Sequence, residues 1–192
     1  SEMCIRDRHI HFQRFHNGGH YDEPLKIIGD TTETGTSVKF KADPEIFTET
    51  TVYDYEVLLK RLREQAFLNA GVRIVFSDLR DDDNIQSEIL HYEGGIRQFV
   101  EHIHKVKGLD PLSDKVIYVS GSKGDSTAEI ALQWNDSYNE DIRSFANNIH
   151  TVDGGTHETG FKNALTKVIN EYGKKFNLIK DNADKLIGDD VR

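Results

Sequence analysis

The chain has 192 residues, with 24 Lys and Arg against 33 Asp and Glu, and its formal net charge is −9. Hydrophobic residues make up 36% of it and occur through the whole length, which excludes a disordered or fibrous protein. A single Cys excludes a disulfide framework and a Cys-based zinc site. No apolar run approaches the roughly 20 residues of a membrane-spanning helix. The acidic balance argues against a strongly basic grip on nucleic acid within this stretch.

The first eight residues differ in character from the rest. Met3 and Cys4, the only Met and the only Cys of the chain, both lie there. The stretch has neither the apolar region of a signal peptide nor an amphipathic period, and it resembles translated sequencing-adapter sequence. We therefore expect residues 1–8 to be a non-native tail, leave them out of the fold prediction and treat the chain as a fragment of a longer protein.

The first half of the chain predicts antiparallel strands around one helix. Strands are expected over residues 9–15, running into a turn at Asn17-Gly18-Gly19, and over residues 25–30, 36–40, 72–76 and 89–92. Apolar residues from Tyr55 to Phe67 recur at the helical period, which predicts a helix over residues 51–69. Thr50 or Thr51 is expected to cap the start of this helix, and Gly71 to follow it as a left-handed C-cap.

A second unit is expected to begin at Gly94-Gly95. Helices are predicted over residues 96–106 and from residue 156 onward, with three strands between them over residues 116–120, 127–134 and 142–149. Thr156 is a candidate N-cap for the second of these helices. Residues 120–127 contain glycines and a lysine, but without the spacing of a phosphate-binding loop, so they favour a hairpin turn. The pattern is α+β in both parts.

Histidines offer the nearest approach to a metal site. His9 and His11 would point to one face of a strand, an arrangement that suits zinc or nickel. The alternative is that they are ordinary half-exposed strand residues, because no carboxylate stands at a fixed spacing to orient their rings. His102 and His104 are two apart on a helix and do not face each other. His157-Glu158 lacks the second His of a metalloprotease helix, and no residue stands in a recognisable nucleophile setting. The residues alone predict no catalytic group and no metal site.

Five stretches, in the same order, resemble the B-subunit family of bacterial type II DNA topoisomerases, which comprises the B subunits of gyrase and topoisomerase IV. They are GDTTETGT (29–36), YEVLLKRLREQAFLNAG (55–71), HYEGGI (91–96), ALQWND (131–136) and NNIHTVDGGTH (147–157). The resemblance implies that residues 9–93 are the C-terminal part of a GHKL ATPase domain. Residues 94–192 would then be a transducer domain, incomplete at its C-terminus, with a ribosomal-protein-S5-like α+β fold.

The resemblance also implies a site and a function. Thr36 matches a threonine hydrogen-bonded around the adenine of ATP, Val38 matches an apolar position of the same pocket, and Lys162 matches a basic residue lining the DNA cavity. The parent would be an ATP- and Mg²⁺-dependent cytoplasmic enzyme that couples ATP hydrolysis to DNA strand passage. Its partners would be double-stranded DNA, the gyrase A subunit and a second copy of the B subunit, with no membrane contact.

The groups that this family uses for hydrolysis match no residue of the chain. The family's general base, its magnesium-binding asparagine and its glycine-rich lid precede the position of residue 9, and its lysine loop for the γ-phosphate follows residue 192. We therefore expect the chain alone to be inactive as an ATPase, because stabilising a transferring phosphoryl group needs those groups in place. Two alternatives stay open: the topoisomerase IV member of this family, and a non-catalytic α+β interaction module with a transducer-like fold.

Overall fold

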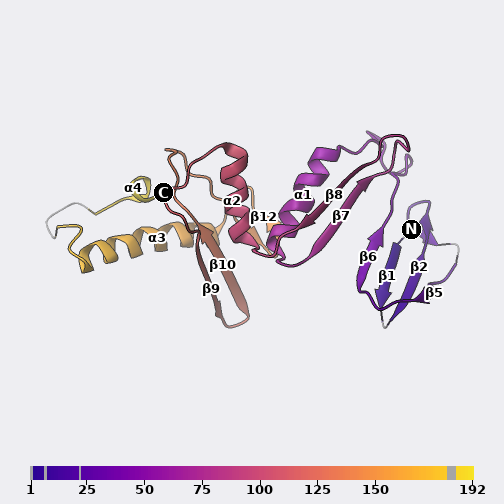
Figure 1. Cartoon of the computed structure of the whole chain (residues 1–192), viewed down its shortest axis with the longest axis horizontal. Coiled ribbons are helices and arrows are strands. Elements are labelled where there is room, and N and C mark those ends of the chain that lie inside the picture. The colour runs from indigo at the N-terminus through magenta and orange to yellow at the C-terminus, as the bar shows by residue number, and fades with distance from the viewer. Residues whose placement is uncertain (1, 7, 22, 181–184) are drawn as a thin grey trace. The chain divides into compact units, whose positions relative to one another are not determined.

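The computed structural model describes residues 2–6, 8–21, 23–180 and 185–192 (Figure 1). It divides into two compact units, Ser1–Leu58 and Leu59–Arg192. None of the described helices is both long and apolar enough to cross a membrane.

The first unit is built on a four-stranded antiparallel sheet with the order β5-β2-β1-β6. Its strands are β1 Glu2–Arg6, β2 His9–Gln13, β5 Lys26–Asp30 and β6 Gly35–Val38. A small hairpin, β3 Phe15–His16 with β4 His20–Tyr21, closes around Asn17 and two glycines, all three with positive φ. The strands predicted over residues 25–30 and 36–40 are confirmed as β5 and β6. The strand predicted from residue 9 is interrupted at Arg14 and forms β2 and β3, and the predicted turn at Asn17 follows it.

Strand β1 was not predicted, because residues 1–8 were left out of the fold prediction. Its backbone pairs with β2 on one side and β6 on the other, so that Met3 is in register with Phe12 and with Ser37. Backbone N–H and C=O groups form such a ladder whatever side chains they carry. Leaving residues 2–6 out of the predicted fold was therefore wrong. Ser1 and Asp7 lie outside the described residues.

Helix α1, Tyr55–Leu68, begins later than predicted because Asp54 caps it. The Asp54 carboxylate accepts the backbone N–H of Val57 at 3.0 Å, which satisfies one of the donors left free at a helix start. Thr50 instead accepts the N–H of Val52 in the preceding turn, so the predicted cap at Thr50 or Thr51 is wrong. Beyond the helix, Gly71 adopts the predicted left-handed conformation, with φ of 84°.

The second unit continues with a hairpin and a helix. Strands β7, Arg73–Asp78, and β8, Gln86–His91, pair antiparallel as predicted. Helix α2, Ile96–Lys107, follows Gly95, whose φ is 58°. A Cβ at Gly95 would lie 3.2 Å from the Cβ of Ala70, so glycine permits both the left-handed backbone and the close approach to the end of α1.

A long hairpin and a short one follow. Strands β9, Ile117–Lys123, and β10, Ser126–Leu132, pair around Gly124, which confirms the hairpin turn predicted there. The single strand predicted over residues 142–149 is wrong: β11, Phe145–Ala146, and β12, Ile149–His150, fold back on each other. The turn between them is made by Asn147 and Asn148, both with positive φ.

Two helices complete the second unit. Helix α3, Thr156–Lys175, has Gly155 at its N-cap position and no side-chain cap, so the predicted cap at Thr156 is wrong. A short helix, α4 Gly188–Val191, was not predicted. It packs beside α3 (Figure 1), where Asn170 bonds to both the N–H and the C=O of Leu186 at 2.9 Å.

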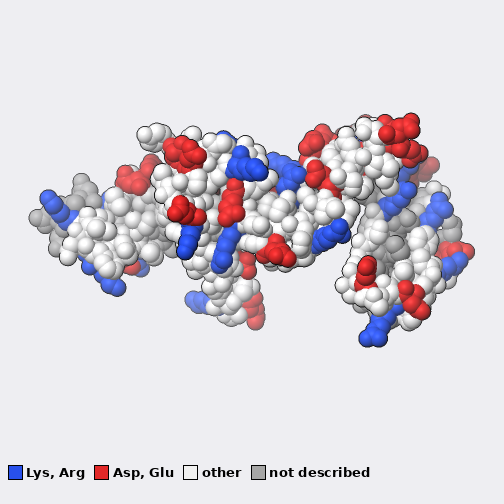
Figure 2. Space-filling view, in the orientation of Figure 1, with Lys and Arg blue, Asp and Glu red and all other residues white. Residues whose placement is uncertain are grey.

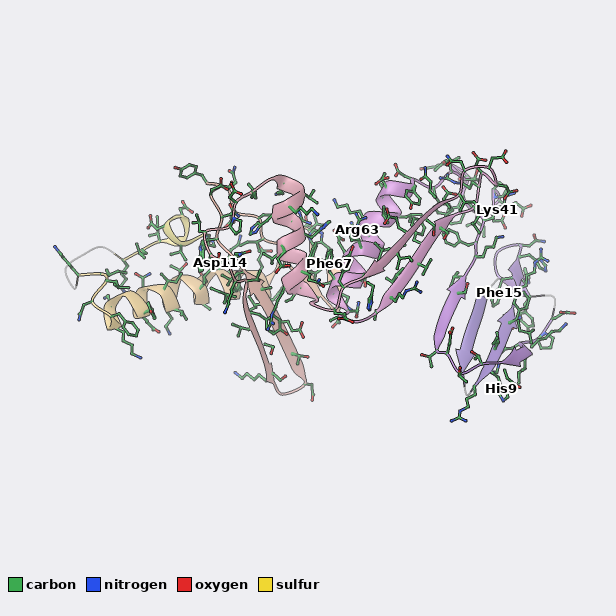
Figure 3. The ribbon with its side chains drawn as sticks, in the orientation of Figure 1. His9, Phe15, Lys41, Arg63, Phe67 and Asp114 are labelled. Atoms are coloured by element: carbon green, nitrogen blue, oxygen red, sulfur yellow. The ribbon has the colours of Figure 1, made fainter. Side chains whose placement is uncertain are left out.

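The core of the second unit is a stack of aromatic rings around Phe67, which is 1% exposed. Phe67, labelled in Figure 3, stacks on Tyr92 with ring centroids 3.7 Å apart and on Phe99 at 4.8 Å. The series continues through Phe145, 6.3 Å from Phe99. Residues from both sides of the predicted boundary at Gly94-Gly95 therefore share one core, and large stacked rings are among the groups that stabilise a core most.

Candidate functional site

The predicted nucleotide residues lie on strand β6, at one edge of the first sheet. Thr36 and Val38 are two apart, so their side chains share one face of the strand, as the sequence predicts. Strand pairing through β1 places Thr36 in register with His11 of β2, and Val38 in register with Gln13. Val38 is 55% exposed, so this apolar position remains open to a ligand or to further chain.

A shallow depression of about 720 Å³ lies beside this sheet. Its lining is Arg8, His9, Asp30, Thr31, Thr32 and Glu33. His9 Nδ1 lies 2.8 Å from an Asp30 carboxylate oxygen, because the two residues are register partners on β2 and β5. Sequence spacing gave no orienting carboxylate for His9, and strand pairing supplies one. Even so, no group of three or more His, Cys, Asp or Glu among the described residues is arranged to hold a metal ion.

Lys162, the predicted DNA contact, lies on α3 between two carboxylates. Its Nζ is 3.0 Å from an oxygen of Glu140 and 3.0 Å from an oxygen of Glu158, one helical turn earlier. The other oxygen of Glu140 accepts the Nε–H of Arg192 at 2.8 Å. Ser144 donates its hydroxyl to the second oxygen of Glu158 at 2.7 Å. The Lys162 side chain is 26% exposed, so the ammonium group is paired but still reaches solvent.

The residue after Glu140 repeats this arrangement with two other bases. Asp141 lies 2.8 Å from Lys107 Nζ, at the end of α2, and 3.3 Å from Arg143 Nε. Two adjacent carboxylates in the loop between β10 and β11 thus hold four basic residues from different parts of the unit. We call Lys107, Arg143, Lys162 and Arg192 the basic quartet.

The ionisation of these groups follows from the pairing. Hydrogen bonds from Lys162, the larger effect, and from Arg192 hold the pKa of Glu140 below its usual range, although burial opposes them. Burial raises the pKa of Asp141, but the hydrogen bonds from Lys107 and Arg143 outweigh it and leave that pKa lowered. The two carboxylates beside Lys162 raise its pKa in turn. Glu140, Asp141 and Lys162 are therefore charged at neutral pH.

The ALQWND stretch has a structural role next to this network. The indole N–H of Trp134 donates to the C=O of Val191 at 2.7 Å, which fixes α4. The Asn135 side chain lies 3.3 Å from the ring of His104, itself only 8% exposed. Asp136 exchanges hydrogen bonds with the backbone of Asp110. This stretch thus holds the C-terminal segment and the end of α2 in place around the basic quartet.

The family resemblance singled out Lys162, and the rest of the network was not predicted. One half of it has a sequence signal, since Glu158 precedes Lys162 by four residues on a helix, a spacing that brings the two side chains together. The other half has none, because Glu140 is 22 residues from Lys162 and 52 from Arg192. The roles of Thr36, Val38 and Lys162 stay predictions.

Comparison with known proteins points to one family. The family model described as DNA gyrase B matches residues 95–192. The chain is 48% identical to the DNA gyrase B protein of Bacillus mycoides over 97% of its own length and 45% of that protein. It is 50% identical to the DNA gyrase B protein of Streptococcus pneumoniae over 95% of its own length and 28% of that protein. The chain therefore spans less than half the length of these relatives.

Solved structures agree in fold. The 43K ATPase domain of Thermus thermophilus gyrase B, crystallised in complex with an aminocoumarin, is 35% identical and matches with a TM-score of 0.79. The match covers 98% of this chain and 50% of that one. The DNA gyrase B protein from Myxococcus xanthus, 24% identical, shares the fold with a TM-score of 0.70 over 90% of this chain. The predicted α+β fold class is confirmed.

Proposed function

This chain belongs to the DNA gyrase B family, and on that premise we propose that it is the segment coupling ATP binding and hydrolysis to DNA strand passage. The observation that carries the proposal is the match of nearly the whole chain to the gyrase B ATPase domain, with 35% identity and a TM-score of 0.79. The parent enzyme would be an ATP-dependent type II topoisomerase of the cytoplasm. The curated relatives named above are gyrase proteins, which favours gyrase over topoisomerase IV.

We assign residues 9–93 to the end of the GHKL ATPase domain and residues 94–192 to the transducer domain. The family model begins at residue 95, which supports a boundary at the two glycines. Residues 1–8 would be an adapter-derived stretch. Through their backbone hydrogen bonds, residues 2–6 would occupy the place in the sheet that a native strand holds in the parent.

The roles of the site residues follow from the same premise. The Thr36 hydroxyl, which can donate and accept a hydrogen bond, would take part in the network around the adenine of ATP, and Val38 would pack on the ring from the same strand face. Ligands for Mg²⁺ would come from the part of the parent that precedes residue 9. Lys162 would face the transported DNA duplex. The gyrase A subunit and a second copy of the parent protein would complete the assembly.

ATP hydrolysis by a chimera tests the nucleotide part of this proposal. Residues 9–192 replace the matching segment of Streptococcus pneumoniae gyrase B, which is 50% identical. The chimera should hydrolyse ATP, and the 192-residue chain alone should not. Thr36→Val should weaken ATP binding about three- to tenfold through loss of one hydrogen bond. Ser37→Ala, on the opposite face of β6, is the matched control and should leave ATP binding unchanged. Equal effects of the two variants would refute the assigned role of Thr36.

A further inference from the structure

The loop between β10 and β11 carries two adjacent carboxylates that bind four bases. Glu140 holds Lys162 and Arg192, and Asp141 holds Lys107 and Arg143. These bases come from α2, the loop itself, α3 and the end of α4. One dipeptide thus links bases from four parts of the unit in one ion-pair network.

We propose that the basic quartet is a phosphate-binding surface for duplex DNA, and that Glu140 and Asp141 occupy it as a competing anion built into the chain. The duplex as partner rests on the function proposed above. Each carboxylate stands where a phosphate oxygen of the duplex would bind, since Lys and Arg recognise both groups in the same way. DNA binding would then require the two carboxylates to give up their bases.

The exposure of the ion pairs suits such an exchange. The side chains of Glu140 and Lys107 are 39% and 47% exposed, and those of Asp141, Arg143, Lys162 and Arg192 are 19–28% exposed, so every pair is partly open to water. Ion pairs with this exposure contribute at most about 1 kcal/mol each, because solvent screens them and both side chains lose freedom. A polyanion can therefore replace the carboxylates without a large loss of folding stability.

The positive charge of the basic quartet explains why the chain would need carboxylates that compete with DNA. Four bases facing a duplex would each release counterions from it and bind it strongly at low salt. The two loop carboxylates, with Glu158 beside Lys162, leave a net charge of about +1 over this surface. On the face that Figure 2 shows, Lys and Arg atoms are likewise interspersed with Asp and Glu atoms over the second unit. Weak binding lets a duplex pass through rather than stay bound.

The loop is anchored on both sides of the acidic pair, which confines the exchange to a few residues. Before the pair, the Asn135 side chain accepts the N–H of Ser137 at 2.8 Å. After it, Ser144 bonds to Thr151 and to Glu158, both at 2.7 Å. Between these anchors, ion pairs with the basic quartet are the described side-chain contacts of Glu140 and Asp141.

Binding of a fluorescein-labelled duplex of about 20 base pairs to the 192-residue chain tests the proposal by anisotropy across a range of salt concentrations. Glu140→Gln with Asp141→Asn keeps the shape and the hydrogen-bond acceptors but removes two negative charges. The slope of log K against log salt should steepen by about 2, so that a fourfold drop in salt strengthens binding about tenfold more than in the unmodified chain. The single variant Glu140→Gln should give about half of that steepening.

A matched control separates this surface from bulk charge. Asp82→Asn with Asp83→Asn changes the net charge by the same amount in the β7–β8 turn, where neither residue has a described ion pair, and should leave DNA binding unchanged. Lys162→Gln added to the Glu140→Gln and Asp141→Asn variant should remove part of the gain. The position of Trp134 fluorescence emission checks that each variant is folded, since this lone Trp is bonded to Val191.

Two results would overturn the proposal. One is an equal gain from both double variants, which would make the effect one of net charge. The other is a folded Glu140→Gln and Asp141→Asn variant with unchanged DNA binding, which would make the network purely structural. Failure of the function proposed above is a separate result: the chimera would not hydrolyse ATP, whatever the duplex binding of the chain.

Discussion

Phe67 and Leu90 have the largest fully buried side chains among the described residues. Phe67 is 1% exposed and stacks on rings from both sides of the predicted domain boundary. Phe67→Ala should lower the free energy of unfolding by about 3–5 kcal/mol, because it leaves a cavity as well as removing buried apolar surface. Phe176→Ala is the control: its ring is 52% exposed and touches Tyr172, so about 1 kcal/mol or less is expected. Urea unfolding measures both, and similar losses would contradict the assigned core.

His102 should make stability depend on pH. Burial, together with Arg63, Arg143 and Lys105, lowers its pKa in the folded chain from the usual 6.5. As pH falls below 6.5, the unfolded chain takes up a proton at this residue while the folded chain does not, so the stabilisation present above 6.5 is lost. His102→Gln should therefore flatten the fall in melting temperature between pH about 7 and about 5.5. An unchanged slope in the variant would show that His102 is not the cause.

At the scale of elements, the short hairpin β11–β12 shows where sequence patterns stop being informative. Residues 142–149 contain the β-branched Ile142 and Ile149 and the aromatic Phe145, which favours one strand. Asn147 and Asn148 instead adopt φ of 49° and 64° and reverse the chain. Asn tolerates this left-handed region, but it also occurs elsewhere, so the pair alone did not identify the turn. A tertiary contact favours it: the Asn148 C=O accepts a hydrogen bond from Gln65 of α1 at 2.7 Å.

Asn148 allows a test of this turn. Asn148→Ala should destabilise the chain by about 1 kcal/mol more than Asn148→Gly, because a Cβ penalises the left-handed backbone whereas glycine adopts it freely. Both variants lose the amide contact with Asn69 at 3.0 Å, so the comparison isolates the backbone conformation. Chemical unfolding of the two variants gives the difference directly. Equal stabilities, or a less stable glycine variant, would argue against a strained turn here.

At the scale of the whole molecule, the sequence predicts the elements better than their ends or their long-range contacts. Periodicity locates α1, α2 and α3, because apolar residues recur along one face of each helix. The cap at Asp54 was missed because neighbouring threonines are equally good N-cap residues. Glu140, which binds Lys162 and Arg192, was missed because only the folded chain brings these three residues together. The site residues themselves came from family resemblance, not from spacing.

The most direct test of the coupling role is supercoiling by the Streptococcus pneumoniae chimera that carries residues 9–192, assembled with its gyrase A partner. Incubated with a relaxed plasmid, the chimera should supercoil the DNA when ATP is present and not when it is omitted. The same segment with Phe67→Ala, which disrupts the shared core, should lose most of this activity. A chimera that folds, binds gyrase A and hydrolyses ATP but leaves the plasmid relaxed would contradict the claim that this segment couples hydrolysis to strand passage.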